Sequence, residues 1–251
     1  MNQLSVVIIT FNEERNIGRC LQSVQALADE IIVVDSFSTD RTAEICASFN
    51  VRFYSNPFAG HIEQKNYALT LAGNPYILSL DADEELSPEL TASLFVIKNN
   101  PASHGYYFNR LTNYCGKWIR HGGWYPDQKL RFFEKGKAKW GGKNPHDQLL
   151  LHDPKNKKLL KGDLLHYSYY SLEDHLKQVN SFTTIGARSA FEEGRRAGMI
   201  SLIIKPIYKF IRDYILLGGF LDGYYGFIIA RISANATYLK YAKLRELWRK
   251  K

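Results

Sequence analysis

Short apolar runs alternate with segments of helical spacing over the first hundred residues. The run from Leu4 to Thr10 is nearly continuous and rich in β-branched residues, as are the runs over 30–35 and 76–80, which is typical of strands covered on both faces. Strands are predicted over 4–10, 30–35, 51–54 and 76–80, and helices from Asn12, over 40–49 and over 62–71. This alternation with short connections predicts an α/β fold with an open, mostly parallel central sheet between helices.

The pattern changes after His104. Three further strands are predicted over 105–110, 129–133 and 159–167, separated by loops rich in glycine and aromatic residues. The loop aromatics are Trp118, Trp124, Tyr125 and Trp140. Aromatic faces among polar side chains are typical of sugar-binding surfaces, because C–H faces of a sugar stack on them. Closure of a small second sheet by the same side chains is the alternative.

The last 80 residues are predicted to be helical. Ser171 and Asp174 form a capping-box pattern, and the helix that they open is expected to continue to about Arg196. Two strongly apolar helical stretches follow, over 199–217 and 220–248, each interrupted by charged residues. Such helices suit the plane of a membrane interface better than a transmembrane span, although packing against another protein surface would also explain them.

Charge supports the membrane interpretation. The net charge is +8, and residues 195–251 alone contain 12 Lys or Arg against 3 Asp or Glu. This localised basicity predicts contact with an anionic membrane surface through the C-terminal helices. Nucleic-acid binding is disfavoured because the basic segment is too apolar to follow a phosphate backbone. Three cysteines without metal-ligand spacing, together with no visible secretory signal, favour a cytoplasmic location.

Acidic residues stand where the predicted parallel strands end. Asp81 and Asp83 follow the strand over 76–80, and their spacing of two would point both carboxylates the same way along an extended chain. Carboxylates suit a hard divalent cation that also holds phosphate oxygens. Thr10 and Asp35 end two other strands, and ligands bind such sheets at this edge. The alternative is an acidic turn before the helix that Ser87 and Pro88 predict.

These segments together resemble the inverting family 2 glycosyltransferases with the GT-A fold. The matching segments, in order, are Val-Val-Ile-Ile-Thr-Phe-Asn-Glu-Glu, Ile-Ile-Val-Val-Asp-Ser-Phe-Ser-Thr-Asp-Arg-Thr, Gln-Lys-Asn-Tyr-Ala and Leu-Ser-Leu-Asp-Ala-Asp-Glu-Glu. Later segments resemble the lipopolysaccharide core-biosynthesis glucosyltransferases. These are Gly-Trp-Tyr-Pro-Asp, Lys-Leu-Arg-Phe-Phe, Pro-His-Asp, Leu-His-Tyr-Ser and Gly-Phe-Leu-Asp-Gly.

The resemblance implies roles for residues of the nucleotide-sugar site. Thr10 and Glu13 would line the nucleotide pocket, and Asp35 would bind the base or the ribose. Lys65 would lie near the nucleotide or its diphosphate, where the family often has arginine. Asp81 would hold the ribose or a metal-bound water.

The metal and the catalytic base are also implied by the resemblance. Asp83 would be the direct ligand of Mg²⁺ or Mn²⁺, and His166 would contact the metal or the diphosphate. Inversion needs a carboxylate to take the proton of the acceptor hydroxyl. Asp147 is the first candidate for this base and Asp127 the second. Each could instead cap a turn or bind acceptor hydroxyls, and His166 could be a buried structural histidine.

The expected protein is a metal-dependent hexosyltransferase, with glucose as the expected sugar, a UDP-sugar as donor and a lipid-linked saccharide as acceptor. Residues 1–170 would form the GT-A catalytic domain, divided into a nucleotide-sugar half (1–100) and an acceptor-side half (101–170). Residues 171–251 would hold the enzyme on the inner face of the cell membrane. A polyprenyl-phosphate glycosyltransferase and a non-catalytic carbohydrate-binding protein are the alternatives.

Overall fold

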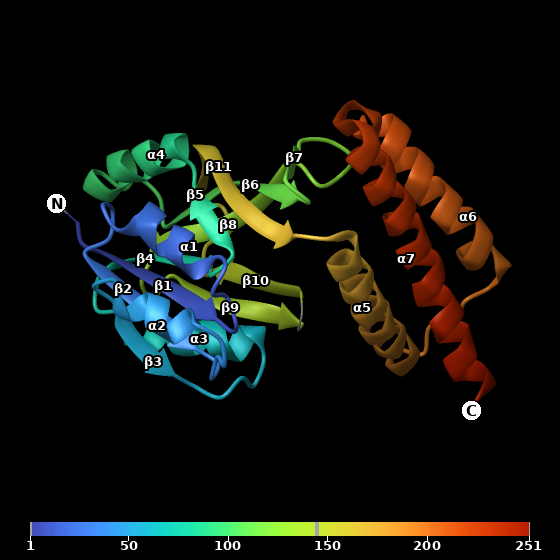
Figure 1. The fold of residues 1–251 in the computed structure, drawn as a ribbon, viewed down its shortest axis with the longest axis horizontal. Helices are drawn as coiled ribbons and strands as arrows, with labels where there is room; N and C mark the ends of the chain where they lie inside the picture. Colours follow the sequence, from blue (N-terminus) through green and yellow to red (C-terminus); the bar gives the residue numbers. More distant parts are fainter. Residues whose placement is uncertain (1, 144–145, 251) are drawn as a thin grey trace. The chain divides into compact units, whose positions relative to one another are not determined.

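A computed structural model describes residues 2–143 and 146–250 (Figure 1). The chain forms two compact units, which are described separately below. The first unit contains Met1–Arg110 and Gln128–His166, and the second contains Leu111–Asp127 and Tyr167–Lys251. The second unit therefore contains not only the C-terminal helices but also a segment assigned from the sequence to the acceptor-side half, because β7 and the loop after it pack with those helices.

The strands and helices of the chain have the following bounds. The strands are β1 Leu4–Thr10, β2 Glu30–Asp35, β3 Arg52–Ser55, β4 Tyr76–Asp81, β5 Glu84–Leu86, β6 Gly105–Tyr114, β7 Lys117–Ile119, β8 Asp127–Glu134, β9 Ala138–Lys143, β10 His146–Leu151 and β11 Lys157–Tyr169. The helices are α1 Ile17–Val24, α2 Thr42–Ala47, α3 His61–Leu71, α4 Pro88–Asn99, α5 Leu172–Glu192, α6 Met199–Phe210 and α7 Gly223–Arg249, with a π-helical turn at Ile211–Leu216 and a 3₁₀ turn at Gly219–Asp222.

The main sheet has the strand order β3-β2-β1-β4-β8-β6-β11-β5, with β7 paired to β6. Strands β1 to β4 pair in parallel, whereas β8 joins β4 antiparallel and β11 joins β5 antiparallel. Strands β9 and β10 form a separate antiparallel pair. The sequence prediction of a mostly parallel N-terminal sheet, followed by a differently built second part, is confirmed.

Both faces of β1 are buried, as its apolar run predicts. Val6 and Ile8 pack with α1 residues such as Leu21 on one face. Val7 belongs to the cluster on the other face, which includes Ala68 of α3. Successive side chains of a strand point to opposite faces, so a strand covered twice needs apolar residues at every position.

The helix expected from Asn12 begins later, at Ile17. Asn12 has a φ of 54°, a left-handed conformation that cannot start an α-helix but that asparagine tolerates. Its side-chain oxygen accepts a hydrogen bond from the Thr39 backbone N–H at 2.8 Å, and its own N–H donates to Ser38. Asn12 therefore joins the loops after β1 and β2 instead of capping a helix.

The other differences between the predicted and the observed helices and strands are smaller. Helix α2 covers 42–47 instead of 40–49, and the short strands β5, β7, β9 and β10 were not predicted. The helix predicted after Ser87 is confirmed, and the Ser87 side chain caps it by accepting from Leu90 N–H.

Helices α5, α6 and α7 form most of the second unit (Figure 1). Ser171 caps α5 as predicted, accepting from the Asp174 N–H at 3.1 Å, but α5 ends at Glu192. The turn between α6 and α7 needs glycine at two close positions. A Cβ on Gly226 would lie 1.9 Å from the Gly219 carbonyl oxygen, so any larger residue there would displace the backbone.

The turn between α6 and α7 is fastened by Asp222. Its buried carboxylate accepts hydrogen bonds from the backbone N–H groups of Arg120 and His121. Lys117 donates to the Asp222 carbonyl. Asp222 therefore fixes the loop after β7 to the start of α7.

No single helix in the described part of the chain is long and apolar enough to cross a membrane. The pair Met199–Leu216 and Gly219–Arg249, bent by 69° at the break between them, has sufficient length and apolar composition when taken together.

Candidate active site

The carboxyl ends of β1, β2 and β4 meet at one edge of the sheet in the first unit. In the pairing register Thr10 lies opposite Asp35, and Ile9 lies opposite Asp81. The polar residues that end these strands are therefore neighbours, as predicted. This is the edge at which open α/β sheets bind ligands.

Lys65 of α3 connects two of the predicted site residues. Its ammonium lies 2.8 Å from Asp81 Oδ1 and 2.8 Å from Asp147 Oδ2 of β10, and the side chain is almost fully buried. The same ammonium lies 4.3 Å from the ring centroid of Trp140, within the range of a cation–π contact. Lys65 therefore fixes the relative positions of the first candidate base and the end of β4.

A second buried cation, Arg131 of β8, was not predicted. One guanidinium nitrogen donates to Asp81 Oδ2 and to Glu84 Oε1, each at 2.7 Å. Burial would raise the pKa of Asp81, but Lys65 and Arg131 outweigh it and hold that pKa well below its usual value. Asp81 is therefore a carboxylate held between two cations.

Glu84 belongs to the same network. It is fully buried on β5 and also accepts from the Asp81 backbone N–H at 3.0 Å. Burial lowers the pKa of Arg131, but the Glu84 and Asp81 carboxylates reverse that effect and raise it. A lone arginine within the apolar run over 129–133 was the available sequence signal for a buried ion pair.

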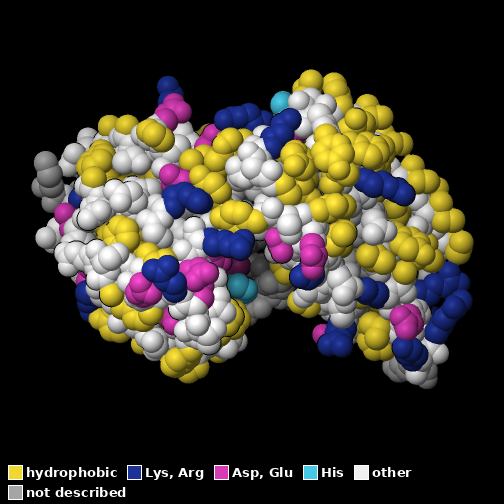
Figure 2. Space-filling view, in the orientation of Figure 1, with side chains coloured by type: hydrophobic (Ala, Val, Ile, Leu, Met, Phe, Trp, Pro, Cys, Tyr) yellow, Lys and Arg dark blue, Asp and Glu magenta, His cyan; other side chains and the backbone are white. Residues whose placement is uncertain are grey.

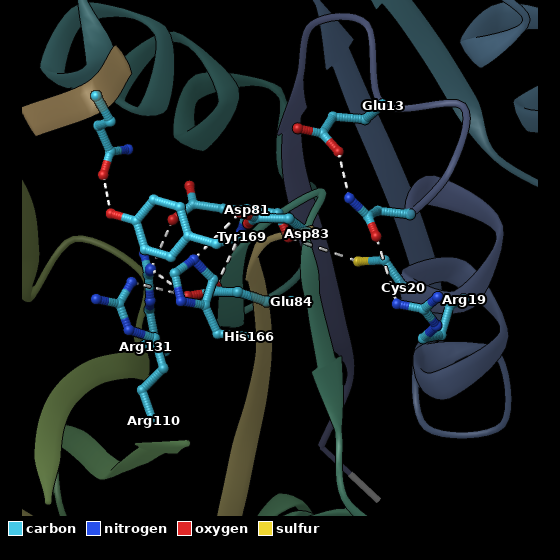
Figure 3. Close-up of polar contacts among 12 residues, drawn as sticks. Glu13, Arg19, Cys20, Asp81, Asp83, Glu84, Arg110, Arg131, His166 and Tyr169 are labelled. Atoms are coloured by element: carbon cyan, nitrogen blue, oxygen red, sulfur yellow. Dashed lines mark hydrogen bonds and ion pairs between the residues drawn. The ribbon is translucent and has the colours of Figure 1, made fainter. Parts of the chain in front are cut away.

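Asp83 and His166 face each other in the first unit (Figure 3). Asp83 Oδ2 lies 3.1 Å from His166 Nε2, and both side chains are partly buried. Strand β11 places His166 directly opposite Glu84 of β5 in the pairing register, which brings the imidazole beside the turn after β4. Two residues assigned to the metal from the sequence are thus brought together.

The donor set fits a divalent ion. Carboxylate oxygen and imidazole nitrogen are both donors to divalent ions, and the 3.1 Å between Asp83 Oδ2 and His166 Nε2 would let both side chains reach one ion. Among residues 2–143 and 146–250, no group of three or more His, Cys, Asp or Glu side chains is arranged to hold a metal. Phosphate oxygens would have to complete the coordination.

Glu13 lies in the loop after β1 and is partly buried. Burial raises its pKa to about 7, with smaller contributions from the Asp83 and Asp40 charges, against the lowering effect of a hydrogen bond from Asn16. Asn16 donates to Glu13 Oε2 at 2.7 Å. Near neutral pH this carboxyl therefore exists in both protonation states.

The side chains of Thr10 and Asp35 differ in their hydrogen bonding. The Thr10 hydroxyl is buried and has no hydrogen-bond partner among the described residues, so it can bond a ligand group. Asp35 already accepts from the Ser38 backbone N–H at 2.8 Å and from the Ser38 hydroxyl. Its present bonds shape the loop after β2.

The remaining candidates fall in different places. Asp127, the second candidate base, is grouped with the second unit. Pro145, in the Pro-His-Asp segment, lies outside the described residues.

Trp124 packs against Tyr114 and Tyr169 in an apolar cluster of the second unit, as expected for a tryptophan that closes a core. Trp140, expected in or beside a loop, lies in β9 and contacts two site cations, Lys65 and Arg131.

Comparison with known proteins identifies the family. A model described as glycosyl transferase family 2 matches residues 5–149, which is more than half of the chain. The chain belongs to this family. An uncharacterised glycosyltransferase of Rickettsia bellii is 32% identical over 256 residues, covering 98% of this chain and 87% of the relative. The lipopolysaccharide core biosynthesis glycosyltransferase LpsC of Rhizobium meliloti is 30% identical over 258 residues, covering 96% and 91%.

A solved structure supports the fold across the whole chain. The S. aureus TarS fragment 1–349 matches with a TM-score of 0.50 and 16% identity, covering 99% of this chain and 91% of that one. The predicted GT-A fold with added C-terminal helices is confirmed. The family 2 assignment makes this protein a glycosyltransferase, and the edge of the sheet that carries Asp81, Asp83 and Lys65 is its candidate active site.

Proposed function

We propose that this family 2 enzyme transfers a hexose, with inversion, from a UDP-sugar to a lipid-linked saccharide such as a lipopolysaccharide core intermediate. The observation that carries the proposal is the pairing of Asp83 with His166 at 3.1 Å, two residues after Asp81, whose carboxylate contacts the buried cations Lys65 and Arg131. Transfer from a sugar nucleotide needs positive charge that neutralises its diphosphate and a carboxylate that deprotonates the acceptor hydroxyl. Side chains of both kinds lie at this site.

Asp83 and His166 would hold the divalent ion. A bound Mn²⁺ or Mg²⁺ supplies positive charge that stabilises the departing diphosphate. Carboxylate oxygen suits both ions, whereas an imidazole nitrogen is more typical of transition metals, so the donor set favours Mn²⁺. The unbonded Thr10 hydroxyl offers a hydrogen bond to the nucleotide, and Glu13 lies in the loop that follows it.

Asp147 is the proposed base. Its carboxylate takes the proton from the acceptor hydroxyl while that oxygen forms the new bond to the anomeric carbon. The bond from this carbon to the diphosphate oxygen breaks, and its electron pair leaves with UDP. Lys65 positions Asp147 by its 2.8 Å contact with Oδ2. Because the attack comes from the side opposite the leaving group, an α-linked donor gives a β-linked product.

Relatives support the choice of donor and acceptor. LpsC, similar to this chain over nearly its full length, is named for lipopolysaccharide core biosynthesis. The S. aureus TarS fragment has also been solved with UDP. A lipid-linked saccharide agrees with the similarity to LpsC. Its lipid also agrees with the exposed apolar helices of the second unit, which would lie at a membrane.

Membrane association belongs to the same proposal. Helix α6 has no buried residue, and its exposed positions include Ile200, Ile203, Ile204 and Ile207. An apolar helix face of this kind suits a membrane interface. We place the enzyme in the cytoplasm, held peripherally on the inner face of the cell membrane by its C-terminal helices.

The test is a transfer assay with purified protein, core-truncated lipopolysaccharide and a panel of radiolabelled donors. The panel contains UDP-glucose, UDP-galactose, UDP-N-acetylglucosamine and GDP-mannose, each with Mn²⁺, with Mg²⁺ and with EDTA. The expected result is Mn²⁺-dependent transfer from one UDP-hexose, and a β-linkage in the NMR spectrum of the product. Transfer to polyprenyl phosphate in place of the saccharide would contradict the proposed acceptor, and equal transfer in EDTA would contradict the metal.

A further inference from the structure

The second unit exposes an unusual amount of apolar surface along one helix. Exposed apolar side chains of α6 and the turn after it include Ile200, Ile203, Ile204, Ile207, Tyr208, Ile211, Ile215 and Leu216, each at least 41% exposed. Most recur at spacings of three and four residues, so they share one helix face. Figure 2 shows hydrophobic side chains covering much of the visible surface of this unit, with Lys and Arg gathered toward its C-terminal end.

A basic pocket lies where α5 ends, α6 begins and α7 approaches its end. Its cavity of about 300 Å³ is lined by Ala190, Arg195, Arg196, Lys205, Lys240, Tyr241 and Leu244. Four of these side chains are cationic and none is acidic. Glu193, which pairs with Arg195 at 2.9 Å, neutralises one of the four charges. The pocket therefore carries a net positive charge suited to an anion.

Two of the cations, Lys205 and Arg196, are held in place by aromatic neighbours. Lys205 donates to the Tyr241 hydroxyl at 3.0 Å and lies 4.5 Å from the centroid of its ring. Arg196 lies 4.9 Å from the ring centroid of Trp248, whose indole N–H donates to the Arg195 carbonyl at 2.7 Å. Because these side chains are already ordered, they lose less conformational entropy when an anion binds.

The pocket and the apolar face adjoin, because Lys205 of the pocket lies one helical turn from Tyr208 at the edge of that face. A ligand that satisfies both must combine an anionic head with apolar chains. We propose that this pocket binds the phosphate headgroup of an anionic phospholipid, whose acyl chains lie along the apolar face of α6. The proposal rests on the membrane association proposed above and names the lipid chemistry that it recognises.

A vesicle-binding experiment with a matched pair of variants tests the site. The pocket variant carries Arg196→Gln and Lys240→Gln. The control variant carries Lys177→Gln and Arg188→Gln, which remove the same charge from exposed positions of α5 that do not line the pocket. Each protein is titrated with phosphatidylcholine vesicles, with vesicles that also contain phosphatidylglycerol, and with inorganic phosphate. Thermal unfolding checks that each variant is folded.

The pocket variant is expected to bind phosphatidylglycerol vesicles about 25-fold more weakly than the wild type, at roughly fivefold for each basic residue near an anionic surface. The control variant should lose only a few-fold. Equal losses in the two variants would overturn the site in favour of general charge attraction. Pocket-dependent binding of inorganic phosphate without binding to anionic vesicles would overturn the lipid as ligand.

A second readout separates this proposal from the proposed function. Turnover of a soluble, delipidated saccharide acceptor should be the same in the wild type and the pocket variant, because none of the residues that line this pocket belongs to the candidate active site. Lost vesicle binding with unchanged turnover supports the lipid site. Absence of turnover in both proteins contradicts the proposed function and leaves the vesicle comparison as the measure of the lipid site.

Discussion

Lys65 and Asp147 are joined by a 2.8 Å contact between residues 82 positions apart in the sequence. The same ammonium contacts Asp81 at the end of β4, so one buried lysine connects the proposed base to the strand end that precedes Asp83. A carboxylate fixed in this way cannot move independently of the edge proposed to bind the nucleotide. This relationship favours Asp147 over Asp127 as the base.

We therefore expect Asp147→Asn to lower turnover by about 10²- to 10⁴-fold, the usual contribution of a general base, while UDP affinity stays close to that of the wild type. Steady-state kinetics and calorimetric titration with UDP measure the two quantities. Asp127→Asn is the matched control and should retain most of the activity. The reverse order of effects would transfer the role of base to Asp127.

Arg131 should be important for stability because it is buried between two carboxylates. Arg131→Met leaves Glu84 charged and buried, and removing one partner of such a pair costs about 3–5 kcal/mol. Urea unfolding should show this loss. The double variant Arg131→Met, Glu84→Gln should recover part of it, because it removes a buried charge whose only other cation, Arg110, lies farther away, at 3.7 Å, among the described residues. No recovery in the double variant would show that Glu84 is not the source of the cost.

Glu13 should make the protein less stable as pH rises. Its folded pKa of about 7 exceeds the ordinary value of 4.5, so the folded state binds more protons between these values and the free energy of unfolding falls from pH 4.5 to 7. Glu13→Gln should remove this slope and stabilise the protein by up to about 3.5 kcal/mol above pH 7, at roughly 1.4 kcal/mol for each of about 2.5 pKa units. Urea unfolding across this range measures it, and an unchanged slope would contradict the raised pKa.

His175 of the second unit should make the protein less stable as pH falls. Burial lowers its pKa to about 4, and its Nδ1 lies 2.9 Å from the Tyr114 hydroxyl. The unfolded state binds more protons between pH 6.5 and 4, so stability from this group is present above pH 6.5 and is lost as pH falls toward 4. His175→Asn should flatten the pH dependence of unfolding in that window. A slope that persists unchanged would assign the acid sensitivity to other groups.

The parallel strands β1 and β2 could be predicted from the sequence because a strand buried on both faces is apolar at nearly every position between its ends. Strand β9 could not, since Ala138–Lys143 contains two adjacent glycines and two lysines beside Trp140, without an alternating pattern, and is defined by pairing with β10. The predicted start of α1 was wrong because the Asn12 side chain accepts a hydrogen bond from the backbone of Thr39, 27 residues away, instead of capping a helix.

The site was predictable to the extent that strand ends reveal it. Asp81 and Asp83 follow directly from the pattern of β4, and the family resemblance added His166. The Arg131–Glu84 pair was missed because its partners are 47 residues apart, a relationship created by the sheet order and not by local spacing. The contact of Lys65 with Asp147 was hidden for the same reason.

In the proposed mechanism a divalent ion held by Asp83 and His166 binds the diphosphate of a UDP-sugar. The decisive experiment is calorimetric titration of UDP into the wild type and into Asp83→Asn, with Mn²⁺ and with EDTA. Wild-type binding should require Mn²⁺, and the folded variant should lose most of the Mn²⁺-dependent affinity. Equal UDP affinity in EDTA, or unchanged Mn²⁺-dependent affinity in Asp83→Asn, would show that these residues do not hold an ion on the diphosphate.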